Sequence, residues 1–325
     1  MINEIGSEFH KISTDTGCGM KFPRPGSLVF SGRTAIQTVL ARLPHAKSAL
    51  LPSYCCDSMI EPFRRAGLKI SFYEVNKGEF GISFGSFGRS DLLLWCNYFG
   101  FKNEMPDFEG IVVEDITHSL FSECPCHNKS DYLVASVRKW LPVSCGGYCS
   151  VDAMLDSPPA HFLQNKHHAM RLKAEYLREG GAEKKNAFLP MFKESNEWLA
   201  AHYTDLGIDA DSKEYLNRVD MEKIRQARVR NARILYEGLQ NKVEFLFGED
   251  QMDCPLFVPL IFRKNRDEIR KKLAENFIYC PVHWPLPKSD CRSNLYNWEL
   301  SLVCDQRYTE NDMDRIVSVL LRSLK

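Results

Sequence analysis

Hydrophobic and polar positions alternate along the first half of the chain in a pattern that predicts strands and helices in turn. Continuous apolar runs, typical of strands buried on both faces, lie at Ser48–Tyr54, Lys69–Val75, Asp91–Phe99, Gly110–Asp115 and Tyr132–Ser136. Apolar residues recur at helical spacing in Gly32–Leu43 and Asp57–Ala66. This order predicts an α/β fold, a three-layer sandwich in which helices cover both faces of a mostly parallel sheet.

The pattern changes near residue 160. Helices with polar faces are expected at roughly 160–180, 183–205 and 219–240. Beyond them, the chain predicts strands at Pro255–Phe262, Tyr279–Trp284 and Glu299–Cys304, a helix at Arg266–Phe277, and a final helix that begins with a capping box of Thr309 and Asp312. We therefore predict a large domain at 1–218 and a small C-terminal α+β domain at 219–325, which includes the 219–240 helix.

Length and charge exclude several classes of protein. The chain has 325 residues, of which 44% are hydrophobic, so it can bury a large core. Its 42 basic residues balance 42 acidic residues, which gives no electrostatic case for a nucleic-acid or anionic-membrane partner. The start of the chain lacks the apolar core of a signal peptide, and no apolar run is long enough to cross a bilayer. We expect a cytoplasmic protein with no nucleic-acid or membrane partner.

The positions of the cysteines indicate reduced thiols and not a disulfide scaffold. The chain has 12 cysteines, but it is far longer than a disulfide-stapled domain. We expect Cys96, Cys149, Cys254 and Cys304 to lie inside apolar strands, where a reduced thiol packs as a small hydrophobic group. The segment Cys124–His127 resembles half of a zinc site. No second pair follows at zinc-site spacing, so we expect no metal.

A lysine and an aspartate, each at the end of an expected buried strand, are the most informative pair in the chain. Lys139 ends the apolar stretch that begins at Tyr132, and Asp115 ends the run that begins at Gly110. The pair fits pyridoxal 5′-phosphate (PLP), whose aldehyde forms a Schiff base with a lysine while a carboxylate keeps the ring nitrogen protonated. Partial burial is expected to lower the pKa of Lys139. The alternative is a solvated lysine at a strand end.

A glycine at the start of the first helix predicts a phosphate site. Within Ser31–Thr34, Gly32 lets backbone N–H groups approach an anion, the helix dipole favours negative charge, and Thr34 adds a hydroxyl group. Ser136, three residues before Lys139, is a candidate for a second hydroxyl. An ordinary helix cap is the alternative interpretation.

Other side chains are candidates for contacts with the cofactor ring. His118 follows Asp115 by three residues and can bond the phenolic oxygen of the cofactor or the aspartate, although a structural histidine fits as well. Tyr54 and Tyr98 are candidates for the face of the ring.

The dipeptide His283-Trp284 is a candidate border of the acceptor-substrate pocket. The prolines at positions 281 and 285 make a buried turn the alternative interpretation.

Several short motifs follow one another along most of the chain. They are Ser31-Gly-Arg-Thr-Ala, Leu51-Pro-Ser-Tyr54, Glu61-Pro-Phe, Val113-Glu-Asp115, Arg138-Lys139 with Gly146-Gly147, Tyr279-Cys-Pro-Val-His283-Trp284-Pro and Asp305-Gln-Arg-Tyr308. In this order they resemble the DegT/DnrJ/EryC1/StrS family of fold-type-I PLP enzymes, mainly aminotransferases that act on nucleotide-linked keto sugars. The resemblance implies Lys139 as the Schiff-base lysine and Asp115 as the partner of the ring nitrogen. It places Gly32, Arg33 and Thr34 at the phosphate.

The chain departs from the family pattern at several positions. His118 stands where the family usually has glutamine, Cys56 where an aromatic side chain stacks on the cofactor, and Cys145 where a glutamate precedes the paired glycines. The Asn-Tyr-Arg segment with which a neighbouring subunit reaches the phosphate is not found in residues 207–219.

The resemblance implies a PLP-dependent transaminase that moves an amino group from L-glutamate, or a similar donor, to a carbonyl acceptor such as a nucleotide-linked keto sugar. Such an enzyme belongs to nucleotide-sugar or polysaccharide biosynthesis. A lysine at position 139 favours transamination, because dehydratases of the family have histidine there. The resemblance also implies a homodimer. The alternative is a PLP-fold protein that has lost turnover and serves as a binding or regulatory module.

Overall fold

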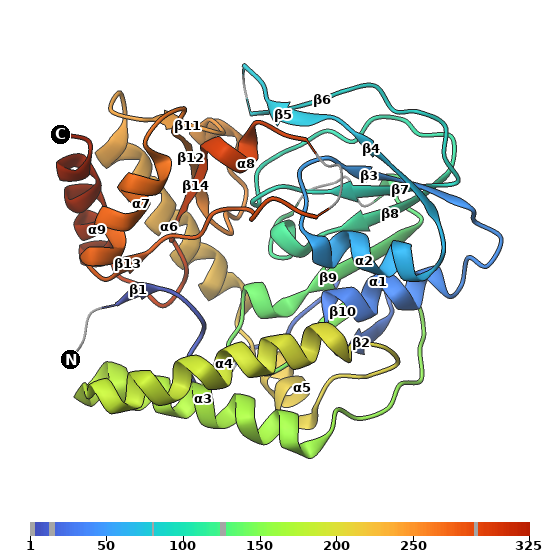
Figure 1. Cartoon of the computed structure of the whole chain (residues 1–325), viewed down its shortest axis with the longest axis horizontal. Coiled ribbons are helices and arrows are strands. Elements are labelled where there is room, and N and C mark those ends of the chain that lie inside the picture. The colour runs from blue at the N-terminus through green and yellow to red at the C-terminus, as the bar shows by residue number, and fades with distance from the viewer. Residues whose placement is uncertain (1–3, 13–16, 80, 124–127, 289–291) are drawn as a thin grey trace. The chain divides into compact units, whose positions relative to one another are not determined.

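The computed structural model describes residues 4–12, 17–79, 81–123, 128–288 and 292–325 (Figure 1). Contacts divide the chain into two compact units, each made of separate stretches. Unit 1 consists of Met1–Glu4, Glu8–Pro44 and Tyr132–Met221, and unit 2 of Ile5–Ser7, His45–Asp131 and Glu222–Lys325. The domain boundary expected at 218/219 stays a prediction.

Part of unit 2 is a parallel sheet with the strand order β8-β7-β3-β4. The strands are β3 (Ser48–Pro52), β4 (Lys69–Tyr73), β7 (Leu92–Cys96) and β8 (Ile111–Asp115), and α2 (Asp57–Arg65) connects β3 to β4. Nearly all side chains of β3, β7 and β8 are buried, as continuous apolar runs require. The parallel sheet of the predicted α/β fold is therefore confirmed, with strands somewhat shorter than the apolar runs.

The rest of unit 2 combines a small antiparallel sheet with helices. The sheet has the order β11-β12-β14, formed by Glu244–Phe245, Val258–Ile261 and Glu299–Leu302. The helices are α6 (Met221–Leu239), α7 (Arg266–Glu275), α8 (Leu295–Trp298) and α9 (Glu310–Ser323). Helices α7 and α9 lie side by side (Figure 1). Shorter elements are β1 (Ile5–Gly6) paired with β13 (Ile278–Tyr279), β5 (Val75–Lys77) paired with β6 (Ile82–Phe84), and the 3₁₀ turns η1 (Thr117–Ser119) and η4 (Glu249–Gln251).

Two predictions for the C-terminal part have opposite outcomes. The capping box of α9 is confirmed, because the backbone N–H of Thr309 donates to Oδ2 of Asp312 at 2.8 Å. The strand predicted at Tyr279–Trp284 is wrong, because β13 ends at Tyr279. Pro281 has no N–H to donate to a neighbouring strand, which is one reason why the apolar run does not continue as one.

Unit 1 contains short antiparallel strands and long helices. Its strands have the order β2-β10-β9 and comprise Ser27–Val29, Gly147–Cys149 and Tyr132–Ser136. Its helices are α1 (Gly32–Leu40), which packs on β9 and β10, α3 (Ala160–Glu179), α4 (Ala182–Ala201) and α5 (Ala210–Asn217). The 3₁₀ turn η3 (Val137–Lys139) follows β9 directly. Strands β2 and β10 have only three residues each, too few for a periodic pattern to predict them.

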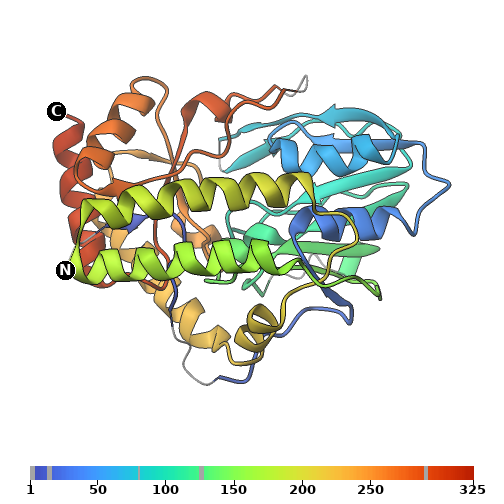
Figure 2. The same cartoon turned by 60° about the horizontal axis from the view of Figure 1, so that its bottom comes forward.

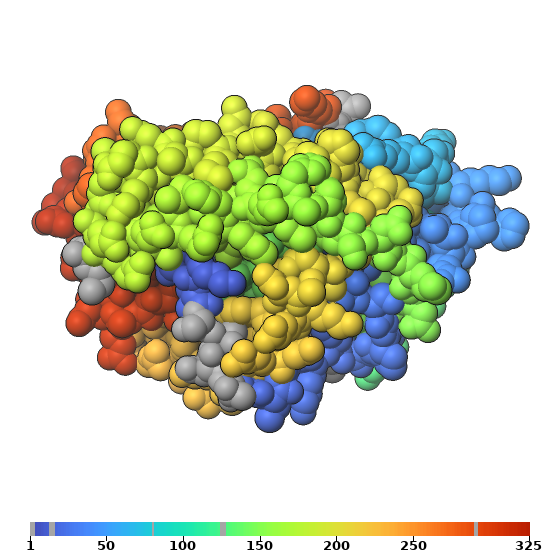
Figure 3. Space-filling model, turned by 90° about the horizontal axis from the view of Figure 1, so that it is seen from below, coloured from blue at the N-terminus to red at the C-terminus, as the bar shows by residue number. Residues whose placement is uncertain are grey.

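Helices α3 and α4 form an antiparallel pair along unit 1 (Figure 2). Gly180 and Gly181 reverse the chain between them with φ angles of 81° and 105°, which non-glycine residues rarely adopt. The buried side chains between the helices are Ala169, Met170, Tyr176, Phe188 and Phe192. The outer faces of the pair form a broad surface of the molecule (Figure 3).

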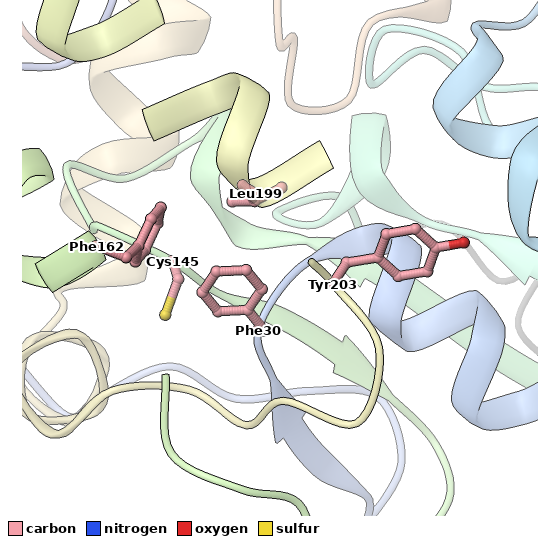
Figure 4. Close-up of a cluster of buried hydrophobic side chains, with 5 residues drawn as sticks. All are labelled: Phe30, Cys145, Phe162, Leu199 and Tyr203. Atoms are coloured by element: carbon pink, nitrogen blue, oxygen red, sulfur yellow. The ribbon is translucent and has the colours of Figure 1, made fainter. Parts of the chain in front are cut away.

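A second buried cluster joins β2 to the helical pair. Its members are Phe30, Cys145, Phe162, Leu199 and Tyr203 (Figure 4). The ring centroids of Phe30 and Phe162 are 5.1 Å apart in an edge-to-face arrangement. Cys145 contributes a small side chain to this cluster, and its thiol donates a hydrogen bond to Oδ2 of Asp209 at 3.0 Å.

The cysteines that we expected to pack as hydrophobic groups do so. Cys96, Cys149, Cys254 and Cys304 are buried free thiols. Cys254 and Cys304 lie outside the strands in which their apolar surroundings placed them.

The buried Arg228 of α6 gives a prediction for stability. Its guanidinium donates to the carbonyl oxygens of Pro255 and Leu256, at 3.2 and 2.9 Å, and to Oε1 of Gln306 at 2.9 Å. Arg228→Ala leaves these acceptors unpaired beside a cavity, so we expect the free energy of unfolding to fall by about 3 kcal/mol in urea titrations.

A matched control lies on the same helix. Arg230 makes an exposed ion pair with Glu310 at 3.5 Å, so Arg230→Ala is expected to cost less than about 0.5 kcal/mol. Equal losses for the two variants would contradict the role given to Arg228.

Candidate functional site

The predicted site residues fall into two groups, one in each unit. Unit 2 contains Tyr54, Asp115, His118, His283 and Trp284, and unit 1 contains Gly32, Arg33, Thr34, Ser136 and Lys139.

In unit 2, the parallel sheet places several of these residues along one edge. Tyr54 follows β3, Tyr98 and Phe99 follow β7, and Asp115 is the last residue of β8. Cys96 and Asp115 pair in register at the ends of their strands. Carboxyl ends of parallel strands lie at the same edge of a sheet, where ligands bind in open α/β folds. The hydroxyl of Tyr98 donates to the carbonyl oxygen of Tyr54 at 2.6 Å, which joins two of these loops.

Four predicted residues of unit 2 meet in one group, here called the histidine–aromatic cluster: Tyr54, His118, His283 and Trp284. The Trp284 ring lies 5.1 Å from Tyr54 and 5.5 Å from His118, measured between centroids. The two imidazoles are 5.5 Å apart and nearly perpendicular. Residues that are far apart in the sequence thus form one contact network.

Asp115 confirms its predicted place at the end of a buried strand. It is 6% exposed, and its Oδ1 accepts a hydrogen bond from the N–H of Thr117 at 2.8 Å. This contact closes the turn that carries His118, so the position of the histidine depends on the aspartate.

His118 is buried, and its hydrogen bonding defines its tautomer. Its Nδ1 accepts from the backbone N–H of Phe99 at 3.3 Å. A neutral imidazole has one donor and one acceptor nitrogen, so the proton of neutral His118 resides on Nε2. The Phe99 ring also contacts the imidazole, with centroids 5.1 Å apart.

Sequence reasoning missed two polar residues behind His283. Glu299 is fully buried, and its Oε2 accepts from the backbone N–H of His283 at 2.7 Å. The hydroxyl of Ser301 hydrogen-bonds to Oε1 of Glu299 and lies 2.9 Å from Nδ1 of His283. The available signal was a glutamate and a serine two positions apart in an otherwise apolar strand, where period-two spacing puts both on one face.

Tyr54 is fully buried among aromatic rings. Its centroid is 5.7 Å from that of Tyr98 and 5.2 Å from that of Tyr296. Burial and then the Glu299 carboxylate raise the pKa of Tyr54 well above 10.0. Within the part of the chain that the structure describes, the Tyr54 hydroxyl has no hydrogen-bond partner of acceptable geometry. A buried polar atom without a partner is unfavourable by about 1–3 kcal/mol.

In unit 1, the start of α1 is a regular capped helix. The Ser31 hydroxyl accepts from the N–H of Thr34 at 3.2 Å, and the Thr34 hydroxyl donates to the carbonyl of Tyr203 at 2.8 Å. The Thr34 hydroxyl therefore has no second proton to offer a phosphate oxygen. A Cβ on Gly32 would lie 3.2 Å from the Cβ of Ser136, so the missing side chain lets Ser136 approach the helix start closely. The phosphate contacts of Gly32 and Arg33 stay predictions.

Lys139 differs from its expected setting. It lies in η3, three residues beyond the end of β9, and not at the strand end. Its side chain is exposed, whereas we expected partial burial. The apolar run predicted the strand correctly to Ser136 but contained no signal for the turn after it.

The paired glycines explain how this turn packs. A Cβ on Gly146 would lie 2.4 Å from a methyl group of Val137, and a Cβ on Gly147 would lie 2.4 Å from the carbonyl oxygen of Ser31. Such distances exclude any side chain there. The two glycines thus bring the turn that carries Lys139 and the capped start of α1 against the same strand.

A charged network adjoins this turn in unit 1. The buried Lys166 lies 3.5 Å from Oε2 of Glu8, and Asn196 accepts hydrogen bonds from Arg138 at 3.0 Å and from Lys166 at 3.4 Å. Burial raises the pKa of Glu8, but the positive charges of Lys166 and Arg138 outweigh it and lower the pKa to about 2. Lys166 belongs to the first of the helices expected to have a polar face, but this lysine is 2% exposed.

The described part of the chain has no group of three or more His, Cys, Asp or Glu side chains placed to hold a metal ion. Residues 124–127, which resemble half of a zinc site, lie outside the described residues. Among the helices that the structure describes, none combines the length and apolarity needed to span a bilayer.

Comparison with known proteins adds a likeness in fold. No family model matches the sequence, and neither does any curated protein. Among solved structures, the sugar aminotransferase CalS13 from Micromonospora echinospora is 14% identical, with a TM-score of 0.62 over 91% of this chain and 86% of that chain. A DegT DnrJ EryC1 StrS aminotransferase from Brucella abortus is 15% identical, with a TM-score of 0.58 over 90% and 84%. Spr1654 from Streptococcus pneumoniae, described as a sugar aminotransferase, is 12% identical, with a TM-score of 0.64 over 93% and 87%.

The chain has the fold of these sugar aminotransferases. Because the likeness covers nearly the whole of both chains, it confirms the fold that the motif resemblance implied. At 12–15% identity, the likeness is one of fold.

The charged network predicts a change of stability at alkaline pH. Burial outweighs the attraction of Glu8 and lowers the pKa of Lys166 from 10.5 to about 8. Between these two values the unfolded chain still binds a proton that the folded chain has released, so stability rises with pH across this window. We expect Lys166→Met to remove this rise, by up to about 1 kcal/mol per pH unit, in denaturant unfolding between about pH 7 and 10.

The matched control is Lys193→Met, which changes an exposed lysine paired with Glu197 at 3.9 Å. This variant is expected to keep the rise. A Lys166→Met variant with the pH dependence of the parent protein would show that the buried amine is not its source.

Proposed function

We propose that this protein is a PLP-dependent aminotransferase. The likeness in fold to solved aminotransferases, which extends over most of the chain, supports the proposal most. The motifs that contain Asp115 and Lys139, which follow each other in the order of the family pattern, support it as well. One of the neighbours, Spr1654, has a structure in its PLP form.

The residues present fit the cofactor in each unit separately. In unit 1, α1 begins at Gly32, and the positive end of the helix dipole with the Ser136 side chain close by suits a phosphate group. In unit 2, the buried carboxylate of Asp115 at a strand end suits a protonated ring nitrogen. When bound, PLP would withdraw electrons from the substrate carbon and carry the amino group between two substrates.

The chain's own residues would have distinct tasks. Lys139 would bind the cofactor covalently and, once released, move a proton at the substrate carbon. Asp115 would keep the ring nitrogen protonated by its negative charge. His118, whose turn Asp115 closes, would contact the edge or face of the ring.

The proposed substrates are an amino donor such as L-glutamate and a carbonyl acceptor of the nucleotide-linked keto-sugar class. The names of CalS13 and Spr1654 as sugar aminotransferases support this class. His283 and Trp284 would border the acceptor.

One observation favours the second candidate, a PLP-binding module without turnover. Cys56 occupies the position at which the family pattern has a ring-stacking aromatic. In the structure it is half-buried, with its thiol 2.8 Å from the hydroxyl of Ser58.

Substitution of the two central residues tests the proposal. We expect Lys139→Ala to lose the absorbance band of the PLP–lysine linkage and all measurable transamination. Asp115→Asn should keep the cofactor but lose turnover by at least about a hundredfold, because the ring loses its protonating partner. Borohydride treatment followed by mass spectrometry should find the cofactor on the peptide that contains Lys139.

Lys129→Ala serves as the control, because Lys129 is an exposed lysine paired with Asp107 at 3.1 Å. Undiminished transamination by the Lys139 variant would refute its role. An absorbance band that does not shift when L-glutamate is added would favour the binding module.

We also propose a homodimer, as the resemblance implies. Light scattering at micromolar concentration should give a mass near twice the 37.4 kDa of the chain. A fully active monomer at that concentration would contradict this expectation.

A further inference from the structure

The hydrogen bonds behind His283 have only one consistent direction. The Glu299 carboxylate can only accept, and it already accepts from the backbone N–H of His283 at 2.7 Å. The Ser301 hydroxyl has a single proton, which its short contact places on the Glu299 side. The hydroxyl must then accept from Nδ1 of His283, 2.9 Å away, so Nδ1 carries the imidazole proton. In the described structure, Nε2 makes no hydrogen bond and presents a lone pair.

We propose that Glu299 and Ser301 are positioning residues that hold His283 in the Nδ1–H tautomer, so that its Nε2 accepts a hydrogen bond from a hydroxyl group of the acceptor sugar. The substrate part of this inference rests on the proposed function; the tautomer part does not. The three residues form a relay from carboxylate to hydroxyl to imidazole, which also favours any positive charge that develops on His283 during proton transfer.

The surroundings of His283 support a ligand contact. The centroid of the His283 ring lies 5.3 Å from that of the half-buried Trp284 and 5.5 Å from that of His118. His118 follows Asp115 by three residues. The fully buried Tyr54 ring, 5.1 Å from Trp284 between centroids, adds an apolar wall on this side. The histidine–aromatic cluster thus combines apolar walls with an imidazole nitrogen that makes no hydrogen bond within the described residues, as small-molecule sites do.

A purely structural role is the competing explanation. Glu299 could serve only to satisfy the backbone N–H of His283. However, the segment is already tied to β14 by the hydrogen bond from the N–H of Ser301 to the carbonyl of Pro281, at 3.0 Å. Burying a carboxylate is unfavourable, and a neutral side chain would satisfy the same N–H. The two explanations differ in one respect, which is whether Glu299 controls the imidazole tautomer.

The substitution Glu299→Gln reverses the relay. The N–H of His283 can only donate, so the amide oxygen of glutamine must face it, and the amide NH₂ must face Ser301. The Ser301 hydroxyl then accepts from the glutamine and donates its own proton to Nδ1, which moves the imidazole proton to Nε2. A role limited to holding the backbone N–H would leave the tautomer unchanged.

Solid-state ¹⁵N NMR of the full-length protein labelled in its histidine rings reads the tautomer directly. The signals of His283 are identified by their loss in His283→Gln. We expect the Nδ1–H tautomer in the parent protein and the Nε2–H tautomer in Glu299→Gln. Retention of Nδ1–H in the variant, or Nε2–H in the parent, overturns the relay.

Glu114→Gln is the matched control, because Glu114 is also a fully buried glutamate of unit 2, held by Asn97 and Ser130. It should leave the His283 tautomer unchanged. A change in this control as large as that in Glu299→Gln would mean that any lost buried carboxylate has the effect, and would overturn the assignment to Glu299.

The substrate part is tested with dTDP-glucose and UDP-glucose, which carry sugar hydroxyls but no keto group. Saturation with either should move the Nε2 signal of His283 in the parent protein. In transamination assays, Glu299→Gln and Ser301→Ala should lose at least about threefold in kcat/KM for the acceptor, which is about half the energy of a hydrogen bond, with the glutamate half-reaction changed less than twofold.

An Nε2 signal that neither nucleotide sugar moves overturns the sugar contact, whereas failure of the proposed function would show separately as a missing PLP–lysine absorbance band. An equal loss in both half-reactions would also count against a role specific to the acceptor.

Discussion

The common direction of β3, β7 and β8 is the constraint on which the candidate site in unit 2 depends. Parallel strands end at one edge, so loops that are separated by some 20–60 residues in the sequence come together there without specific recognition between them. Tyr54, Phe99 and Asp115 occupy this edge because each follows or ends a buried apolar run. The in-register pairing of Cys96 with Asp115 fixes the carboxylate relative to the loop of Phe99.

Hydrogen bonds within unit 2 satisfy the buried polar groups of the candidate site and fix the tautomers of its two histidines. Asp115 closes the turn of His118, Phe99 donates to the same histidine, and Glu299 with Ser301 satisfies His283 from behind. Each buried donor or acceptor would be unfavourable if unpaired, so these contacts determine which nitrogen of each imidazole carries the proton. The two histidines consequently present opposite hydrogen-bonding character, although they belong to one aromatic cluster.

In unit 1, glycines without side chains position the turn that carries Lys139. Gly146 and Gly147 bring β10 against the Lys139 turn and the start of α1 at distances that exclude any Cβ. A Cβ on Gly32 would meet Ser136 at 3.2 Å, a tight contact. The backbone therefore holds the turn firmly, while the Lys139 side chain itself stays exposed.

The sequence by itself determined the parallel strands, the main helices, the capping box of α9 and the placement of Asp115, because each of these depends on local periodicity or on a short motif. It also indicated the fold, through motifs that keep their order along the chain. It could not determine the 3₁₀ turn of Lys139, the end of β13, the use of the Thr34 hydroxyl by Tyr203, or the burial of Lys166, because these depend on what packs against each segment. Glu299 and Ser301 escaped notice for the same reason. Their importance comes from His283, which the sequence places 16 and 18 residues away and only the tertiary structure brings within hydrogen-bond distance.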